Sequence, residues 1–156
     1  MKKVMIAIDY DPTAQKVAET GYTLAKAMNA EVTLLHVVAD PTYYSTLEFS
    51  PIMGFTGFGS ADDFKFINDK ELIEAGYKFL TQIKKHLGDD SIKDLVKEGD
   101  FADTIIKTAK EIHADIIVMG THSRRWLESI LVGSVAEKVL HHSEIPMFIV
   151  PTKEKK

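Results

Sequence analysis

The residues best suited to bind a ligand lie in the stretch MGTHSRRWLESILVGSV, residues 119–135. Gly120 follows an apolar run, where a ligand can approach the backbone closely because glycine has no side chain. Gly133 and Ser134 stand where a helical pattern begins, and the free N–H groups and dipole of a helix start attract phosphate. The alternative is that these glycines only ease a strand-to-helix connection. His122, Ser123, Arg124 and Arg125 would add donors, and Trp126 either packs on the surface, stacks on an arginine or shields the loop.

Two further candidates stand at the ends of apolar runs. Asp9 could accept a hydrogen bond from a ribose or hold a metal ion on phosphate, and its alternative role is to cap the first helix together with Asp11. Val37 could offer its backbone N–H and C=O to the edge of an adenine, but the sequence alone favours a plain core valine.

Several well-known motifs are missing from the chain. It contains no G-x-G-x-x-G after its first apolar run, no G-x-x-x-x-G-K-[ST], no G-x-S-x-G and no H-E-x-x-H. His141 and His142 are adjacent, so on a helix they point about 100° apart and suit a helix end better than a metal ion. We therefore predict no catalytic residue and no metal site.

Five short apolar runs must supply the strands that position these residues. Four are continuous, as expected for strands buried on both faces of a parallel sheet. The remaining run, residues 92–96, has interleaved polar residues and fits an edge strand. The continuous runs are residues 4–8, 32–38, 115–119 and 147–150.

Helical patterns separate the runs. We expect Asp11 to cap the first helix with Pro12 at its first position, Gly88 to end the second and Asp100 to cap the third. The alternation predicts an α/β fold, a doubly wound sheet with helices on both faces and right-handed crossovers. Ligands of such sheets bind beyond the carboxyl ends of the strands, where strand order reverses. The residues to consider are Asp9, 37–40, Gly99 and Gly120 onward.

Length and composition limit the remaining possibilities. The 156 residues fit one domain, predicted as 1–152, with residues 153–156 as a flexible tail. Residues 39–63 form a long loop with several aromatics, either a lid, an oligomer contact or a flexible excursion. The net charge of -4 argues against nucleic-acid binding, and the absence of cysteine excludes disulfides and thiolate chemistry. The apolar run near the start is too short for a signal peptide or a membrane span, so we expect a cytoplasmic protein with no membrane partner.

The combined pattern resembles the universal stress protein family. The resemblance rests on AIDYD, LLHVV and the run DIIVMGTHS…GSVAEKVLHHSEIPMFIVP. It implies five parallel strands in the order 3-2-1-4-5, an adenine nucleotide alpha hydrolase-like fold. By this resemblance Asp9 and Val37 hold the ribose and the adenine, and the loop lines the phosphates. The nucleotide-binding residues it implies are Asp9, Val37, Met119, Gly120, His122, Ser123, Gly133, Ser134 and Val135.

The family has a branch that binds ATP through a pattern like G-x-x-G-x9-G-[ST] and a branch that does not. Here the spacing is intact, but Ser123 replaces the second glycine. We expect retained binding of ATP, with or without Mg²⁺, in a stress-response sensor or regulator with slow hydrolysis at most. The first alternative is a nucleotide-free interaction protein that forms a homodimer through its last strand, Met147, Phe148, Ile149 and Val150. The second is a hydrolase or transferase acting on nucleotides.

Overall fold

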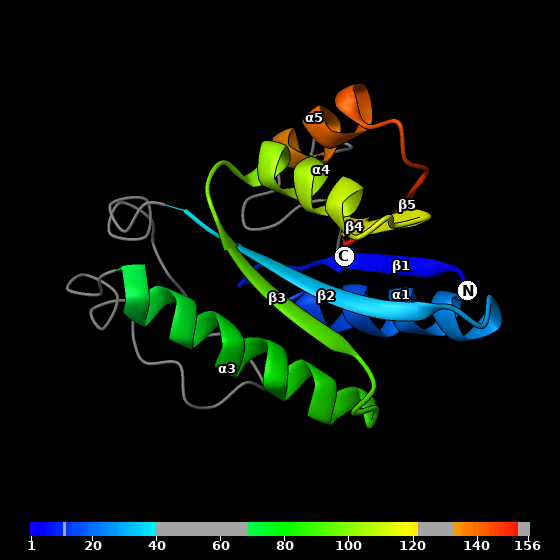
Figure 1. Cartoon of the computed structure of the whole chain (residues 1–156), viewed down its shortest axis with the longest axis horizontal. Helices are drawn as coiled ribbons and strands as arrows, with labels where there is room; N and C mark the ends of the chain where they lie inside the picture. The colour runs from blue at the N-terminus through cyan, green and yellow to red at the C-terminus, as the bar shows by residue number, and fades with distance from the viewer. Residues whose placement is uncertain (11, 40–68, 122–132, 153–156) are drawn as a thin grey trace, which may run out of the picture.

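The computed structural model describes residues 1–10, 12–39, 69–121 and 133–152. Five strands form one parallel sheet in the order β3-β2-β1-β4-β5, which confirms the predicted order (Figure 1). The run with interleaved polar residues is β3, and it lies at an edge of the sheet as expected. The strands are β1 (Lys3–Ala7), β2 (Glu31–Val38), β3 (Lys93–Glu98), β4 (Ile116–Gly120) and β5 (Met147–Val150).

Helices cover both faces of the sheet, as predicted. In Figure 1, α1 (Ala14–Ala27) and α3 (Asp69–Leu87) lie on one side, and α4 (Phe101–Glu111) and α5 (Ser134–His142) lie on the other. Each face has its own hydrophobic core. In β1, Val4 and Ile6 face α1 and α3, whereas Met5 and Ala7 face α4 and α5. Burial on both faces explains why the strand sequences are continuously apolar.

The helix α1 lies directly on the sheet because Gly21 has no side chain. A Cβ atom at Gly21 would lie 2.8 Å from Cδ1 of Ile6 and 3.0 Å from Cγ1 of Val118. Such distances are too short for carbon atoms, so any larger residue would push the helix away from β1 and β4. Gly21 therefore sets the height of α1 above the two strands that carry the predicted site.

The predicted start of the first helix is wrong. The N-cap of α1 is Thr13, whose carbonyl oxygen accepts from the N–H of Val17 at 3.1 Å, so the helix begins at Ala14. Pro12 is exposed and lies before the N-cap, whereas Ile8, Tyr10 and Ala14 are buried in one core cluster, so the packing of these side chains decides where the helix begins. Asp11 lies outside the described residues, as do the tail and all of the predicted loop 39–63 except Ala39.

Two other helix ends follow the sequence signals. Gly88, with φ +70°, comes directly after α3, and glycine is favoured there because its left-handed conformation strains other residues. Asp100 is the N-cap of α4, and its carboxylate accepts from the N–H of Asp103 at 3.1 Å. In the part of the chain that the structure describes, no helix is both long and apolar enough to cross a membrane.

Candidate functional site

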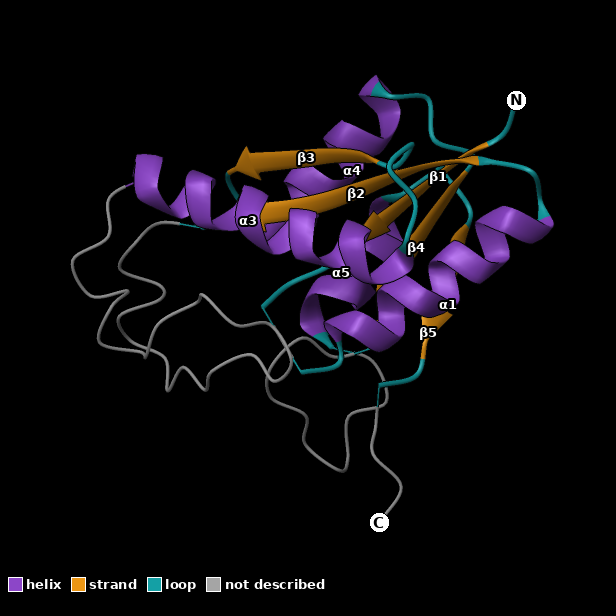
Figure 2. Cartoon of the chain, turned by 90° about the horizontal axis from the view of Figure 1, so that it is seen from below, coloured by secondary structure: helices purple, strands orange, loops and turns teal. Residues whose placement is uncertain are grey.

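A pocket opens beyond the carboxyl ends of β1 and β4, where the strand order reverses. These strands are direct neighbours, and Figure 2 shows them next to each other with α1 and α5 close by. The empty space of the pocket is about 870 Å³, a volume that includes open solvent. Its described walls are formed by Ala7, Ile8, Asp9, Thr13, Ala14, Val17, Leu35, Val37, Phe101, Ile105, Met119, Gly120, Thr121, Gly133, Ser134, Val135 and Ala136.

Every predicted nucleotide-binding residue that the structure describes lines this pocket. His122 and Ser123 lie outside the described residues, as do Arg124, Arg125 and Trp126. The residues brought together come from the ends of three strands and from the start of one helix. They are Asp9, Val37, Met119, Gly120, Gly133, Ser134 and Val135.

The start of α5 supplies backbone donors to the pocket. Gly133 is the N-cap, in an extended conformation (φ -66°, ψ 159°). Because glycine has no side chain, it makes no side-chain hydrogen bond to the first N–H groups of the helix. Helix geometry leaves the N–H groups of Ser134, Val135 and Ala136 without an acceptor inside the helix. All three residues line the pocket, so this wall attracts an anion through its N–H groups and the helix dipole.

Thr121 holds this helix start in place. Its N–H donates to the carbonyl of Val150 at 3.0 Å, and its carbonyl accepts from the N–H of Gly133. Its hydroxyl lies 2.9 Å from that of Thr152 and also accepts from the N–H of Thr152. The end of β4 is thereby joined both to the residues after β5 and to the beginning of α5.

Asp9 is the acidic side chain among the described residues that line the pocket. It is half-buried, and one carboxylate oxygen accepts from the N–H of Tyr10 at 2.8 Å. The alternative that Asp9 is the N-cap of α1 is wrong, because Thr13 occupies that position. Among the described residues, no group of acidic or histidine side chains is arranged to hold a metal ion. Asp9 lines the pocket, so its carboxylate is accessible to a ligand there, either as an acceptor of hydrogen bonds or as a ligand of a metal ion bound to phosphate.

Other residues that line the pocket are apolar, and the sequence pointed to only some of them. Val37 is the second-last residue of β2 and is buried, as expected for a core valine, yet it also lines the pocket. Phe101 and Ile105 of α4 form an apolar wall with Val37, although no sequence motif pointed to Phe101 or Ile105. The sequence did contain a signal for Phe101, because the predicted N-cap at Asp100 places Phe101 in the first turn of a helix that begins beside the strand ends. An apolar wall in a pocket that also has polar groups suits a flat base attached to a polar ligand.

Two other sequence candidates lie elsewhere. Gly99 is not among the pocket residues; its φ of +139° and its N–H bond to the carbonyl of Val38 at 3.1 Å make it a turn residue. Its strand, β3, is at the edge of the sheet and therefore away from the reversal. His141 and His142 are exposed in the last turn of α5, as expected, with His141 near Glu137 at 3.8 Å.

Comparison with known proteins gives one consistent result. Residues 1–151 match the sequence model of the Universal stress protein family. Universal stress protein MJ0577 of Methanocaldococcus jannaschii is 33% identical over 156 residues, covering 97% of this chain and 96% of that protein. Universal stress protein A of Escherichia coli K12 is 26% identical, with 98% and 96% covered.

Solved structures show the same fold. The structure of hypothetical protein MJ0577 has a TM-score of 0.73 at 29% identity and covers 99% of this chain and 98% of that one. A universal stress protein in complex with cAMP has a TM-score of 0.62 at 19% identity, with 97% and 98% covered.

Proposed function

The chain belongs to the universal stress protein family of stress-response proteins, and on that premise we propose that it binds an adenine nucleotide, ATP first among them. The observation that carries this proposal is the open start of α5. Its backbone donors line the same pocket as Asp9 and the apolar wall that contains Val37. A nucleotide needs an anion-binding site for its phosphates, a polar contact for its sugar and an apolar surface for its base. Residues suited to each of these three roles line this pocket.

Each part of the ligand has a fitting wall. The phosphates would lie against the N–H groups of Ser134 and Val135 and close to the backbone of Gly120. Asp9 would accept from the ribose hydroxyls. The base would lie against the apolar wall, with the backbone of Val37 at its edge. A universal stress protein of this fold has been solved in complex with cAMP, which supports an adenine nucleotide as the ligand.

The same walls favour a sensor over a fast enzyme. Among the described lining residues, Asp9 is the only ionisable side chain, and general acid–base catalysis needs a group that takes or gives a proton at the reacting atoms. When bound, Mg²⁺ would supply charge neutralisation for the phosphates. We therefore propose that the protein retains its nucleotide with slow hydrolysis at most, and that bound nucleotide regulates its interactions.

The experiment starts from protein as purified. It is denatured, the released small molecules are chromatographed, and the nucleotide-free protein is then titrated with Mg-ATP by calorimetry, with Mg-GTP as the control. We expect either a released adenine nucleotide or heat of binding with ATP. The absence of both, at millimolar ligand, would remove nucleotide binding as the function.

A second candidate is an interaction function that needs no nucleotide. β5 is one of the two edge strands of the sheet, and large apolar side chains are exposed there and on α5, namely Phe148 at 39% and Leu140 at 54%. An open strand edge with apolar neighbours can pair with a second copy of itself. Pro146 and Pro151 flank β5 and limit the length of such pairing. A homodimer that is equally stable with and without ATP would favour this function.

A further inference from the structure

His36 is a fully buried polar side chain in β2, directly before Val37 in the chain. It has 0% exposed surface, and its Nδ1 lies 3.0 Å from the carbonyl oxygen of Ile8. A carbonyl oxygen can only accept, so Nδ1 carries the proton and donates it to Ile8. A hydrogen bond thus joins the His36 side chain of β2 to the backbone directly after β1.

In a regular parallel sheet the carbonyl oxygen of Ile8 would accept from a backbone N–H of β2, and here it accepts from the His36 ring. β1 and β2 pair in parallel with Ala7 opposite Leu35, and the N–H of Ile8 continues the ladder to the carbonyl of Leu35 at 2.9 Å. In a parallel ladder the next bond would run from the N–H of Val37 to the carbonyl of Ile8. Among the described backbone groups that bond is absent, and the carbonyl accepts from His36 instead.

The following bond of the ladder is replaced as well. It would run from the N–H of Tyr10 to the carbonyl of Val37, but this N–H donates to the carboxylate of Asp9 at 2.8 Å. The neighbouring Val38 faces the other way, because its carbonyl accepts from the N–H of Gly99 at 3.1 Å on the β3 side. The N–H and C=O of Val37 therefore both face the β1 side, in the pocket that Val37 lines.

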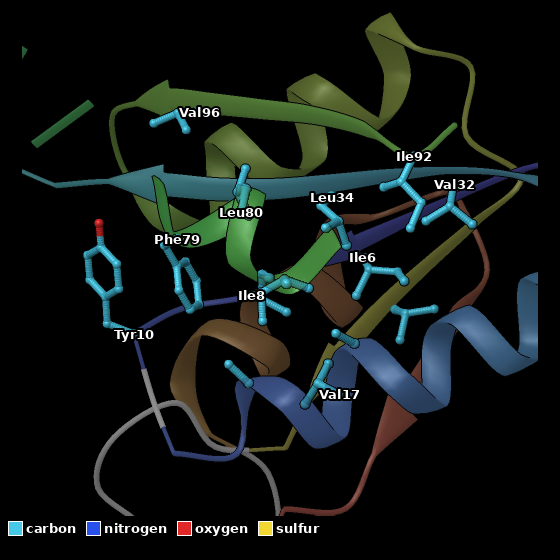
Figure 3. Packing of buried hydrophobic residues seen from close by; sticks show 14 of the residues in the cluster. Ile6, Ile8, Tyr10, Val17, Val32, Leu34, Phe79, Leu80, Ile92 and Val96 are labelled. Carbon is cyan, nitrogen blue, oxygen red and sulfur yellow. The ribbon is translucent and has the colours of Figure 1, made fainter. Parts of the chain in front are cut away.

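The ring of His36 is held in this orientation from two sides. Tyr10 lies on it with ring centroids 4.3 Å apart, and Phe79 meets it edge-on at 5.5 Å. Figure 3 shows Tyr10 and Phe79 beside each other, close to Ile8. Gly76 of α3 leaves room for the ring, since a Cβ atom there would lie 3.1 Å from Cδ2 of His36. The close packing keeps Nδ1 directed at Ile8.

We propose that His36 is a positioning residue that takes the Ile8 carbonyl out of the β1–β2 ladder and so keeps the backbone of Val37 available to read the edge of a base. The identity of the base rests on the proposed function. Adenine presents an acceptor, N1, beside a donor, its amino group, which matches the N–H and C=O of one residue. Guanine presents a donor and an acceptor in the reverse order, so Val37 discriminates ATP from GTP.

The test uses a pair of variants with the same branched shape. His36→Asn keeps a donor at the position of Nδ1, whereas His36→Leu has none, and both lose the ring. His36→Leu is expected to bind ATP about tenfold more weakly than His36→Asn, because the strand end closes and one base contact is lost. Binding of inorganic tripolyphosphate, which has no base, is expected to be the same in both. Equal ATP affinity of the two variants would overturn the role of His36.

Nuclear magnetic resonance of the nucleotide-free wild-type protein tests the contacts directly. Coupling across the hydrogen bond from His36 Nδ1 to the Ile8 carbonyl should be present, and coupling from the Val37 N–H to that carbonyl should appear only in His36→Leu. A Val37–Ile8 bond in the wild type overturns the inference, whether or not ATP binds. Wild-type protein with the His36 bond but without ATP binding overturns the proposed function and the adenine assignment, and it supports the opening of the ladder by His36.

Discussion

The hydroxyl oxygens of Thr121 and Thr152 lie 2.9 Å apart, and they join the end of β4 to the residues after β5. The carbonyl of Thr121 also accepts from Gly133, the N-cap of α5. The anion-attracting helix start is therefore attached to the sheet through one threonine. The hydroxyl stabilises the site indirectly, because it fixes the backbone that carries the Gly133 contact.

Replacing Thr121 by valine keeps the shape of the side chain and removes its hydroxyl. Two hydrogen bonds to Thr152 are lost, so we expect the free energy of unfolding to fall by about 1–2 kcal/mol. ATP affinity should fall several-fold because the start of α5 is less well fixed. Denaturant unfolding and calorimetry measure the two effects, with Thr121→Ser as the control that keeps the hydroxyl. Identical behaviour of the two variants would contradict the role of this contact.

A proline at position 134 separates helix stability from anion binding. Ser134 is the first residue of α5, where proline is well tolerated, and Gly133 has the extended conformation that a residue before proline requires. Ser134→Pro removes one N–H donor without disturbing the helix. We expect unchanged thermal stability and about tenfold weaker ATP binding, measured by calorimetry. Ser134→Ala, which keeps the N–H, should bind within a few-fold of wild type; equal affinity of both variants would place the phosphates elsewhere.

Asp9 is tested through the ligand as well as the protein. If its carboxylate accepts from the ribose, Asp9→Ala should weaken ATP binding about tenfold or more, because the lost hydrogen bond involves a charged group. The same substitution should change binding of 2′,3′-dideoxy-ATP much less, since that ligand has no ribose hydroxyls. Asp9→Asn still offers an acceptor to the Tyr10 N–H and serves as the control for local structure. Equal losses with both ligands would disprove the ribose contact.

Asp100 makes the stability of α4 dependent on pH. The hydrogen bond from the Asp103 amide, with a smaller contribution from Lys138, lowers the pKa of the Asp100 carboxyl below its ordinary value of 3.8. A lowered pKa in the folded state means that the stabilisation is present above that ordinary value and is lost as pH falls through the folded value. Asp100→Ala should lose about 1 kcal/mol at neutral pH. Asp100→Asn should keep most of the stabilisation by the N-cap, and that stabilisation should no longer fall at acidic pH. Denaturant unfolding of both variants and the wild type, between neutral pH and pH 3, measures these differences.

The exposed face of β5 is tested by a charge. Phe148→Glu alters a side chain that is 39% exposed, so we expect the monomer to fold with nearly unchanged stability. If two copies pair along β5, opposing carboxylates should separate them, and sedimentation should change from dimer to monomer. His141→Glu, on the exposed end of α5, adds the same charge away from the strand and is the control. A dimer that survives Phe148→Glu would exclude this edge.

The sequence predicted the order of strands and helices because burial on both sheet faces demands continuously apolar strands. It also placed most strands within a residue or two, and it identified Asp100 and Gly88 as helix ends. The start of α1 was missed because Pro12 is a local signal. The actual start, at Ala14, depends on how Ile8, Tyr10 and Ala14 pack into one core cluster with residues that are distant in the sequence.

The sequence by itself determined which residues follow the strands, since that depends only on the positions of apolar runs. Only the tertiary structure decided which of them meet. Gly99 and Gly120 both stand at or just after a strand end, yet β3 is an edge strand and β4 borders the reversal, so only Gly120 reaches the pocket. The contacts of Thr121 with Thr152 and of His36 with Ile8 join residues 31 and 28 positions apart. Such contacts depend on strand register and helix height, which arise when the whole core packs and which no local pattern encodes.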